Sequence, residues 1–378
     1  MQISGIRTYA LRARLDVPFG FSQLYFEQRE NLLVEVTAED GTAGWGECFG
    51  PALPAQAGVE SCVAPLVIGQ SAFDTELIWH TVWQRNLDHA RHGPLMAALS
   101  GVDMALWDLK GKLTGLPVHR LLGGARVAAV PCYATGHYFR RVPEDEVVAT
   151  ILHEAAGHAD AGFAALKIKI GKNPAFDLRL IEAVRGRFPD LTLMADANHA
   201  YSLNEAMRIG RALQQHGYFF FEEPVAPHAL EDYAALRGKL DLAIAAGENE
   251  QTRFGFRRFV ECRALDIAQP DLAFCGGISE GLKIRALANS FGVDVAPHVW
   301  GTPVGFAAGV HFHATAPPNP GRLEDELLPL ECDHSESPAR ERVCSERVTV
   351  KDGTAVVPDR PGLGVEVDKD ALGEFLVR

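Results

Sequence analysis

The sequence lacks several patterns that would place it in well-defined classes of protein. Its seven cysteines form no C-x-x-C pair and are odd in number, which argues against a disulfide framework and indicates reduced thiols. No apolar run approaches the roughly 18 residues that a membrane-spanning helix needs. The first residues contain no apolar core of signal-peptide length. We therefore expect a cytoplasmic protein.

Positive charge is also in short supply. The chain has 36 Lys and Arg against 49 Asp and Glu, which gives a formal net charge of −13. A surface so negative repels phosphate backbones and anionic lipids, so we expect neither a nucleic acid nor a membrane as a partner. An anionic small molecule would need a local cluster of cations or a metal ion. The positions of Lys, His and carboxylate clusters are therefore informative.

The first third of the chain has the pattern of an α+β unit. Strands are predicted over Ile3–Leu11, Asn31–Thr37 and Ala43–Cys48. From residue 56 to 122 the apolar residues recur at steps of three and four, which is typical of helices with one apolar stripe. The pair Gly123-Gly124 ends this block.

The rest of the chain alternates short apolar runs with helical stretches. Such near-continuous apolar runs are typical of a parallel sheet. They cover Val127–Thr135, Ala164–Ile170, Leu191–Ala195, Tyr218–Phe221, Leu242–Ala246, Ile267–Gln269 and Val293–Ala296. Seven or eight βα units without a dinucleotide-binding fingerprint favour a TIM-like α/β barrel over an open, doubly wound sheet.

Ionisable residues follow the ends of these predicted strands at regular intervals. From Lys169 onward they lie 23 to 27 residues apart, which is the length of one βα repeat. Each repeat thus brings one such group to the carboxyl-terminal rim of the barrel, where active sites lie. The set is Lys167, Lys169, Asp196, Glu222, Glu248, Asp271 and His298.

Three carboxylates in this set should converge. Asp196, Glu222 and Glu248 come from successive strands, and their crowding is unfavourable unless a cation neutralises them. Any one of them alone would fit a helix cap equally well. All three at the barrel spacing indicate an all-oxygen site for a hard ion, chiefly Mg²⁺.

The bases are expected on two sides of this metal site. Lys167 and Lys169 alternate along one strand, so they face the same way, and neighbouring cations should lower the pKa of a base lysine. Asp271 and His298 lie on consecutive strands, which makes a hydrogen bond that orients the imidazole geometrically easy. Glu324 falls where an eighth strand would end, and a rim group and a surface acid are equally plausible there.

These groups together are suited to removing a proton next to a carboxylate. A divalent cation on the carboxylate oxygens stabilises the enediolate that forms, and lysines assist it. Reprotonation from the opposite side gives racemisation or epimerisation, and loss of a β-oxygen gives dehydration. If the β-oxygen belongs to a lactone ring, the reaction is a cycloisomerisation. A non-catalytic barrel would be expected to lack a ligand or a base, and none is missing here.

At this point the sequence resembles the mandelate racemase subgroup of the enolase superfamily over essentially its whole length. The resemblance rests on Lys167-x-Lys169, Asp196-Ala-Asn198, Phe221-Glu222-Glu223-Pro224, Gly247-Glu248-Asn249 and the pair of Asp271 and His298. It implies a (β/α)7β barrel over residues 126–349 and an α+β capping domain over 1–125 that is completed by about 350–378.

The resemblance also implies a role for each residue at the rim. Asp196, Glu222 and Glu248 would bind Mg²⁺, with Mn²⁺ as a substitute. Lys169 and His298 would be the acid/base groups, Lys167 an electrostatic helper and Asp271 the residue that orients His298. Loops near 18–28 and 46–56 would close the site. We further expect a homo-oligomer, from a dimer to an octamer.

Three segments resemble the sugar-acid lactone cycloisomerases of the galactarolactone type more closely. They are Cys132-Tyr-Ala-Thr-Gly136, Asp196-Ala-Asn-His199 and Pro297-His-Val-Trp-Gly-Thr302. After Glu248, however, the chain has Asn249-Glu250 where those enzymes should have Thr-Trp. The main expectation is therefore a lactone cycloisomerase. An aldonate or aldarate dehydratase is the alternative, and a hydroxy-acid racemase or epimerase is third.

Substrate contacts are expected from a few further residues. The candidates are Asn198, Glu324, Trp300 and Tyr25. Phe21, Tyr25 and Phe49 all lie in the two closing loops, where hydrophobic packing of a lid is the favoured interpretation.

Overall fold

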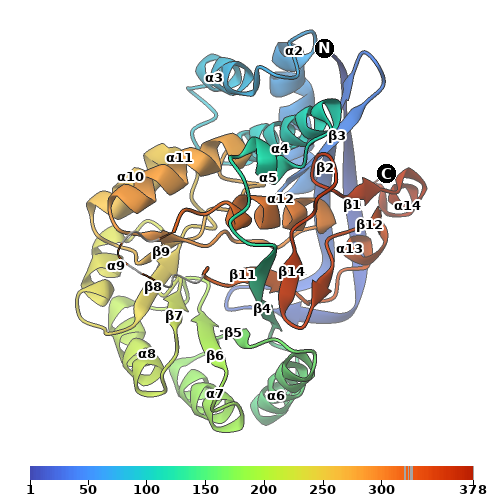
Figure 1. The fold of residues 1–378 in the computed structure, drawn as a ribbon. Coiled ribbons are helices and arrows are strands. Elements are labelled where there is room, and N and C mark those ends of the chain that lie inside the picture. The colour runs from blue at the N-terminus through green and yellow to red at the C-terminus, as the bar shows by residue number, and fades with distance from the viewer. Residues whose placement is uncertain (319–320, 322, 324–326, 378) are drawn as a thin grey trace.

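The structure, a computed structural model, describes residues 1–318, 321, 323 and 327–377. Its first part is a three-stranded antiparallel sheet in the order β1-β2-β3, built from β1 (Ile3–Gly20), β2 (Tyr25–Ala38) and β3 (Ala43–Cys48). Helices and a π-helical turn follow (Figure 1). They are α1 (Ala52–Gly58), η1 (Val59–Val63), α2 (Ala64–Val67), α3 (Thr75–Arg85), α4 (Pro94–Thr114) and α5 (Val118–Leu121).

Helix α4 packs directly on β3 and buries more than the one apolar stripe that the sequence predicts, since every residue from Met96 to Leu109 is buried. Pro94 lies in its first turn and Gly115 ends it in the left-handed conformation, which are the preferred residues at these two ends. A β-carbon on Gly46 of β3 would lie 1.9 Å from the carbonyl oxygen of Gly101 in α4. The contact between helix and sheet therefore requires glycine at this position.

The second part is a parallel barrel sheet with alternating helices. Seven strands lie in the order β10-β9-β8-β7-β6-β5-β4, and β11 pairs in parallel with β4. The eight strands and seven intervening helices form the (β/α)7β arrangement (Figure 1). The strands are β4 (Ala129–His137), β5 (Ala165–Lys169), β6 (Thr192–Asp196), β7 (Phe220–Glu222), β8 (Ala243–Ala246), β9 (Ile267–Ala268), β10 (Asp294–Val295) and β11 (Leu330–Asp333). The helices are α6 (Glu144–Asp160), α7 (Pro174–Arg187), α8 (Leu203–Gln215), α9 (Leu230–Arg237), α10 (Thr252–Glu261), α11 (Gly277–Ser290) and α12 (Pro303–Ala314).

A buried apolar layer fills the barrel below the ionisable rim. It consists of Tyr133, Ala165, Met194, Phe220, Ala245, Ile267 and Ala296. Lys167, Asp196 and Glu222 lie two residues further along three of these strands, so they project from the same inner face. The packed layer therefore forms the floor on which the charged groups rest.

The position expected for the eighth strand is wrong. Glu324 was expected at its end, whereas the strand is Leu330–Asp333. Glu324 itself lies outside the described residues. The connection after α12 is longer than in the other βα units, which displaces the strand from the repeat that the spacing follows.

The C-terminal segment returns to the first part of the chain (Figure 1). The backbone N–H of Val377 donates to the carbonyl of Ala10 in β1, at 2.8 Å. The backbone N–H of Val118 donates to Gly362, at 2.9 Å. The elements of this segment are α13 (Pro338–Arg342), β12 (Cys344–Glu346), β13 (Val350–Lys351), β14 (Thr354–Val356), β15 (Glu366–Val367) and α14 (Lys369–Phe375). No helix among the described residues is long and apolar enough to cross a membrane.

A buried carboxylate joins the first sheet to the barrel. Glu47, on β3, accepts hydrogen bonds from the N–H and hydroxyl of Thr302 and from the N–H of Gly305, at 2.7 to 3.0 Å. These donors lie at the N-terminus of α12, where the helix dipole favours a negative charge. Asn31 of β2 also donates to Glu47, at 3.0 Å. The loop that carries His298 and Trp300 is thereby fixed to the N-terminal sheet.

The Gly46 contact leads to a stability prediction. Gly46→Ala would force β3 and α4 apart, because the new β-carbon meets backbone atoms of Gly101 and Ala105 in α4, which cannot rotate away. We expect the free energy of unfolding in urea to fall by about 1–3 kcal/mol. Gly5→Ala in β1 is the matched control, since a β-carbon there would meet nothing within 4 Å. Equal losses in the two variants would contradict this account of the interface.

Candidate active site

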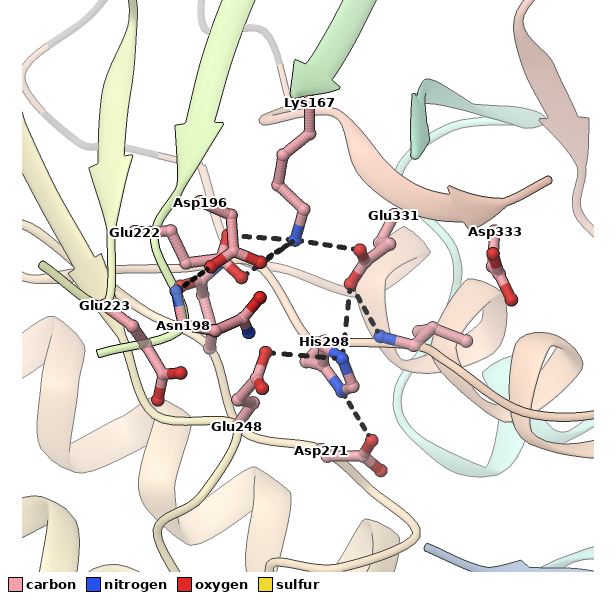
Figure 2. Close-up of polar contacts among 12 residues, drawn as sticks. Lys167, Asp196, Asn198, Glu222, Glu223, Glu248, Asp271, His298, Glu331 and Asp333 are labelled. Atoms are coloured by element: carbon pink, nitrogen blue, oxygen red, sulfur yellow. Dashed lines mark hydrogen bonds and ion pairs between the residues drawn. The ribbon is translucent and has the colours of Figure 1, made fainter. Parts of the chain in front are cut away.

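The predicted rim residues lie together at the carboxyl ends of the barrel strands (Figure 2). Lys169 and Asp196 are register partners on β5 and β6, and Asp196 and Glu222 are partners on β6 and β7. Glu248, Asp271 and His298 follow β8, β9 and β10. Parallel pairing places consecutive strand ends side by side, which explains the convergence.

The three carboxylates form a compact and buried cluster. One oxygen from each of Asp196, Glu222 and Glu248 lies within 4.8 Å of the other two. Burial raises the pKa of Glu248 to about 7, although the positive charge of His298 opposes the shift. Burial also raises the pKa of Glu222 well above its usual value. Oε2 of Glu248 is buried and accepts no hydrogen bond. Three carboxylates offer only oxygen ligands, and one of their buried oxygens accepts no hydrogen bond. Such a donor set fits a hard divalent cation.

The two lysines contact this cluster at different points. Lys167 Nζ donates to both carboxylate oxygens of Glu222, at 2.8 and 2.9 Å. Lys169 Nζ contacts Asp196 and donates to the side-chain oxygen of Asn198 at 2.9 Å. Burial alone would lower the pKa of Lys169, but Asp196 outweighs it and the pKa is raised. This differs from the lowered pKa that we expect for a base, because carboxylates dominate the surroundings of Lys169.

His298 approaches the cluster from the other side, held by Asp271. Its Nδ1 donates to Oδ2 of Asp271 at 2.7 Å, which orients the ring. Its Nε2 then lies 3.4 Å from Oε2 of Glu248. Burial would lower the pKa of His298, but the negative charges of Glu248 and then Glu331 raise it to about 10. The imidazole therefore faces the carboxylates with Nε2, and their charges favour its protonated form.

Asn198 connects the rim to the turn between β1 and β2. Its φ of 42° is left-handed, and its N–H donates to Oδ1 of Asp196 at 2.8 Å. The Ser22 hydroxyl and the Gln23 amide both donate to its carbonyl, at 3.0 and 2.8 Å. The predicted closing loop near 18–28 thus touches a residue that contacts Lys169.

Two residues at the rim were missed in the sequence. Glu331 of β11 accepts from Lys167 Nζ at 2.8 Å, and its Oε2 lies 3.8 Å from Nε2 of His298 (Figure 2). Gln269 donates to Oε2 of Glu222 at 2.7 Å. A signal for Glu331 was present, since charged Glu331 and Asp333 alternate with apolar residues, as the two lysines do on β5.

His298 and Asp271 line a cavity of about 700 Å³. Tyr25, Phe49 and Trp300 line it as well. The Tyr25 hydroxyl is engaged, because it donates to the carbonyl of Arg140 at 3.3 Å. The Phe49 ring meets that of His298 edge-on at 5.4 Å.

Phe21 packs on Phe26 at 5.7 Å between ring centroids. This contact agrees with a hydrophobic lid.

Both side chains of the unexpected pair after Glu248 are engaged in hydrogen bonds. The side-chain amide of Asn249 donates to Oε1 of Glu223 at 2.9 Å. Oε1 of Glu250 accepts from the N–H of Gln251 at 2.8 Å.

Comparison with known families identifies two matching models. Residues 5–123 match the mandelate racemase / muconate lactonizing enzyme N-terminal domain, and residues 150–371 match the enolase C-terminal domain-like model. D-galactarolactone cycloisomerase of Agrobacterium fabrum is 43% identical over 99% of both chains. Arabinonate dehydratase of Saccharolobus solfataricus is 32% identical over 92% of this chain and 90% of that protein.

Solved structures agree with these matches. The 3,6-anhydro-D-galactonate cycloisomerase from Zobellia galactanivorans has a TM-score of 0.90 and 37% identity, with 100% of both chains covered. A mandelate racemase/muconate lactonizing protein from Paracoccus denitrificans complexed with magnesium has a TM-score of 0.86 and 31% identity, with 100% of this chain and 98% of that chain covered.

The position of Glu331 leads to a second prediction. Glu331→Gln removes one of the two carboxylates that Lys167 contacts at 2.8 Å in a buried place. We expect the free energy of unfolding to fall by about 1.5–3 kcal/mol, which is typical of a buried hydrogen bond to a charged group. Glu341→Gln is the control, because Glu341 pairs with Arg347 at a side chain that is 54% exposed. A loss in Glu341→Gln as large as that in Glu331→Gln would contradict the prediction.

Proposed function

The chain belongs to the mandelate racemase / muconate lactonizing enzyme family of the enolase superfamily, and on this premise we propose that it acts on a sugar acid or a sugar-acid lactone. The reaction removes the proton α to a carboxylate and then eliminates the β-oxygen. One observation carries the proposal: two groups able to exchange protons contact one carboxylate cluster, one from β5 and the other from the loop after β10. Lys169 contacts Asp196, and His298 lies 3.4 Å from Glu248.

In this proposal Asp196, Glu222 and Glu248 hold one divalent cation, Mg²⁺, for which Mn²⁺ can substitute. Their all-oxygen donor set supports this choice, and so does the buried Oε2 of Glu248, which accepts no hydrogen bond. When bound, the ion would stabilise the negative charge that collects on the substrate carboxylate as the proton leaves. Lys167, which already bridges Glu222 and Glu331, would add a fixed positive charge at the same place.

Lys169 and His298 divide the proton transfers. Lys169 must be neutral to accept a proton, and its pKa falls to the extent that a cation neutralises Asp196 and its neighbours. His298 presents Nε2 from the other side, and Asp271 keeps its ring in place. The stereochemistry at the α-carbon decides which of the two groups takes the proton and which returns one.

A lactone cycloisomerisation is the main form of the proposal. The α-proton passes to the base, the bond from the β-carbon to the ring oxygen breaks, and the electron pair leaves with that oxygen as a carboxylate. The enol that remains loses its hydroxyl proton as the β-carbon takes one, so the product is an open-chain 2-keto acid isomeric with the lactone. The two cycloisomerases reported above share 43% and 37% identity with this chain, against 32% for the arabinonate dehydratase.

A sugar-acid dehydratase is the second candidate, and Asn249-Glu250 favours it, because this pair departs from the pattern expected of the cycloisomerases. The same groups would act on an open-chain acid, with water as the leaving group. A racemase or epimerase is third. The domain boundary near 125, a homo-oligomer from a dimer to an octamer, and a cytoplasmic location also remain proposals.

The metal assignment is tested without turnover. We expect calorimetry to detect one Mg²⁺ per chain in the wild type, and Asp196→Asn to weaken binding at least about 10-fold, a change of 1.4 kcal/mol. Asp177→Asn is the matched control, because Asp177 is a buried carboxylate that accepts from the Tyr201 hydroxyl at 2.8 Å, outside the cluster. Undiminished Mg²⁺ binding in Asp196→Asn would refute the assignment.

The base assignments are tested by variants. Lys169→Met and His298→Asn should each reduce kcat for 2-keto acid formation by about 10²–10⁴, the usual contribution of general acid–base catalysis. Lys172→Met is the control, because the Lys172 ammonium packs near the rings of Phe139 and Phe176, at 5.9 and 5.8 Å. If Lys169→Met and His298→Asn both keep wild-type activity, the assignments are wrong.

A substrate comparison separates the candidate reactions. Aldonates, aldarates and their lactones are incubated with enzyme and Mg²⁺ in D₂O, and the products are analysed by NMR. Cycloisomerisation predicts that a lactone gives a 2-keto acid with one deuterium at the former β-carbon. Turnover of only the open-chain acid would favour the dehydratase, and exchange at the α-carbon without elimination would favour the racemase.

A further inference from the structure

The guanidinium of Arg29 is buried, yet half of it has no partner. Arg29, on β2, is 2% exposed. Its Nη1 donates to Oδ2 of Asp333 and to the hydroxyl of Ser335, both at 2.8 Å. Its Nε and Nη2 are buried and make no hydrogen bond. Buried polar groups are nearly always hydrogen-bonded, so these two donors indicate a ligand.

The unpartnered donors form one edge of the guanidinium. Nε–H and the facing Nη2–H are parallel, and this pair is the fork that binds both oxygens of a carboxylate. Asp333 and Ser335 fix the opposite corner. The ring of Trp300 fixes the plane, with its centroid 3.7 Å from Cζ of Arg29. The indole Nε1–H of Trp300 is also buried without a partner. The fork is therefore held rigidly, which favours binding.

Arg29 lines the same cavity as His298, one of the two proton-transfer groups. Arg29 and Trp300 line the cavity that His298 and Asp271 also line. Asp333 follows Glu331 by two residues on β11, so both side chains leave the same face of the strand (Figure 2). The Lys169 ammonium lies 5.2 Å from the ring centroid of Tyr138, and the charges of Lys169 and Arg29 both oppose the rise that burial causes in the pKa of Tyr138.

Charges around the fork leave it available to an anion. Asp333 is shared between Arg29 and Arg340, whose Nη1 lies 2.6 Å from it, so one carboxylate faces two guanidinium groups. The carboxylates that line the cavity are engaged elsewhere, and Asp271 among them holds His298. Glu27 pairs with Arg141, Glu30 with Arg12, and Glu47 accepts from Thr302.

We propose that Arg29, assisted by Trp300, binds a second carboxyl group of the substrate, at the end remote from the α-carbon. The substrate class is then a dicarboxylic sugar acid or its monolactone rather than an aldonate. In an open-chain acid this group is a carboxylate throughout. In a lactone it is the acyl group of the ring, which becomes a carboxylate as the ring bond breaks. This inference rests on the proposed function for the role of the other end.

Binding of inert ligands tests the inference directly. The probes are 2-oxoadipate and 2-oxohexanoate, six-carbon 2-keto acids that differ only at the far end and carry no β-oxygen to eliminate. With Mg²⁺ present, calorimetry should show 2-oxoadipate binding at least about 10-fold more tightly to the wild type, a difference of 1.4 kcal/mol. Arg29→Lys, which keeps the charge and removes the fork, should abolish most of this preference.

Arg340→Lys is the matched control, because Arg340 shares Asp333 with Arg29 but does not line this cavity. It should retain the preference for 2-oxoadipate. No preference for 2-oxoadipate in the wild type would overturn the inference. This comparison uses the wild type alone, so it does not depend on whether a variant folds. An undiminished preference in Arg29→Lys, or an equal loss in Arg340→Lys, would overturn it too.

The two proposals fail separately. If the preference for 2-oxoadipate is found but no aldarate or lactone gives a 2-keto acid, the proposed reaction is refuted and the role of Arg29 stays intact. If aldonates and aldarates are both turned over, and the KM of each is the same in the wild type and in Arg29→Lys, the role of Arg29 is refuted and the reaction stays intact.

Discussion

The balance of charge at the buried barrel mouth is the constraint on which the rest of the structure depends. Three carboxylates lie within 4.8 Å of one another. Burial raises the cost of each charge, so the cluster needs cations close by. Lys167 and Lys169 supply two from β5, and His298 supplies a third proton-binding group from the loop after β10. The surroundings that hold the acids in place thus also position the groups that can exchange protons.

The repeat of the barrel explains why so much of this rim was predictable. Each βα unit returns the chain to the same edge of the barrel. A residue that follows a predicted strand is therefore also predicted to lie at that edge. Asp196, Glu222 and Glu248 followed that repeat closely enough to be grouped from the sequence. The helix of the first part was predictable for a similar reason, because the stripe that α4 buries has helical spacing.

The parts that escaped prediction depend on contacts that break the repeat. Glu331 follows a longer connection after α12, so its strand was placed too early in the chain. Arg29 contacts Asp333 across 304 residues, from a sheet outside the barrel, and no spacing rule connects them. The raised pKa of Lys169 was also missed, because it depends on how closely Asp196 lies against the ammonium.

The central claim is that Asp196, Glu222 and Glu248 share one divalent cation beside the two proton-transfer groups. The most direct test is a crystal of the protein grown with Mn²⁺ and measured for the anomalous scattering of manganese. The account predicts a single peak per chain, bound by an oxygen of each of the three carboxylates. A fully occupied manganese at any other place, with these carboxylates left unbound, would contradict it.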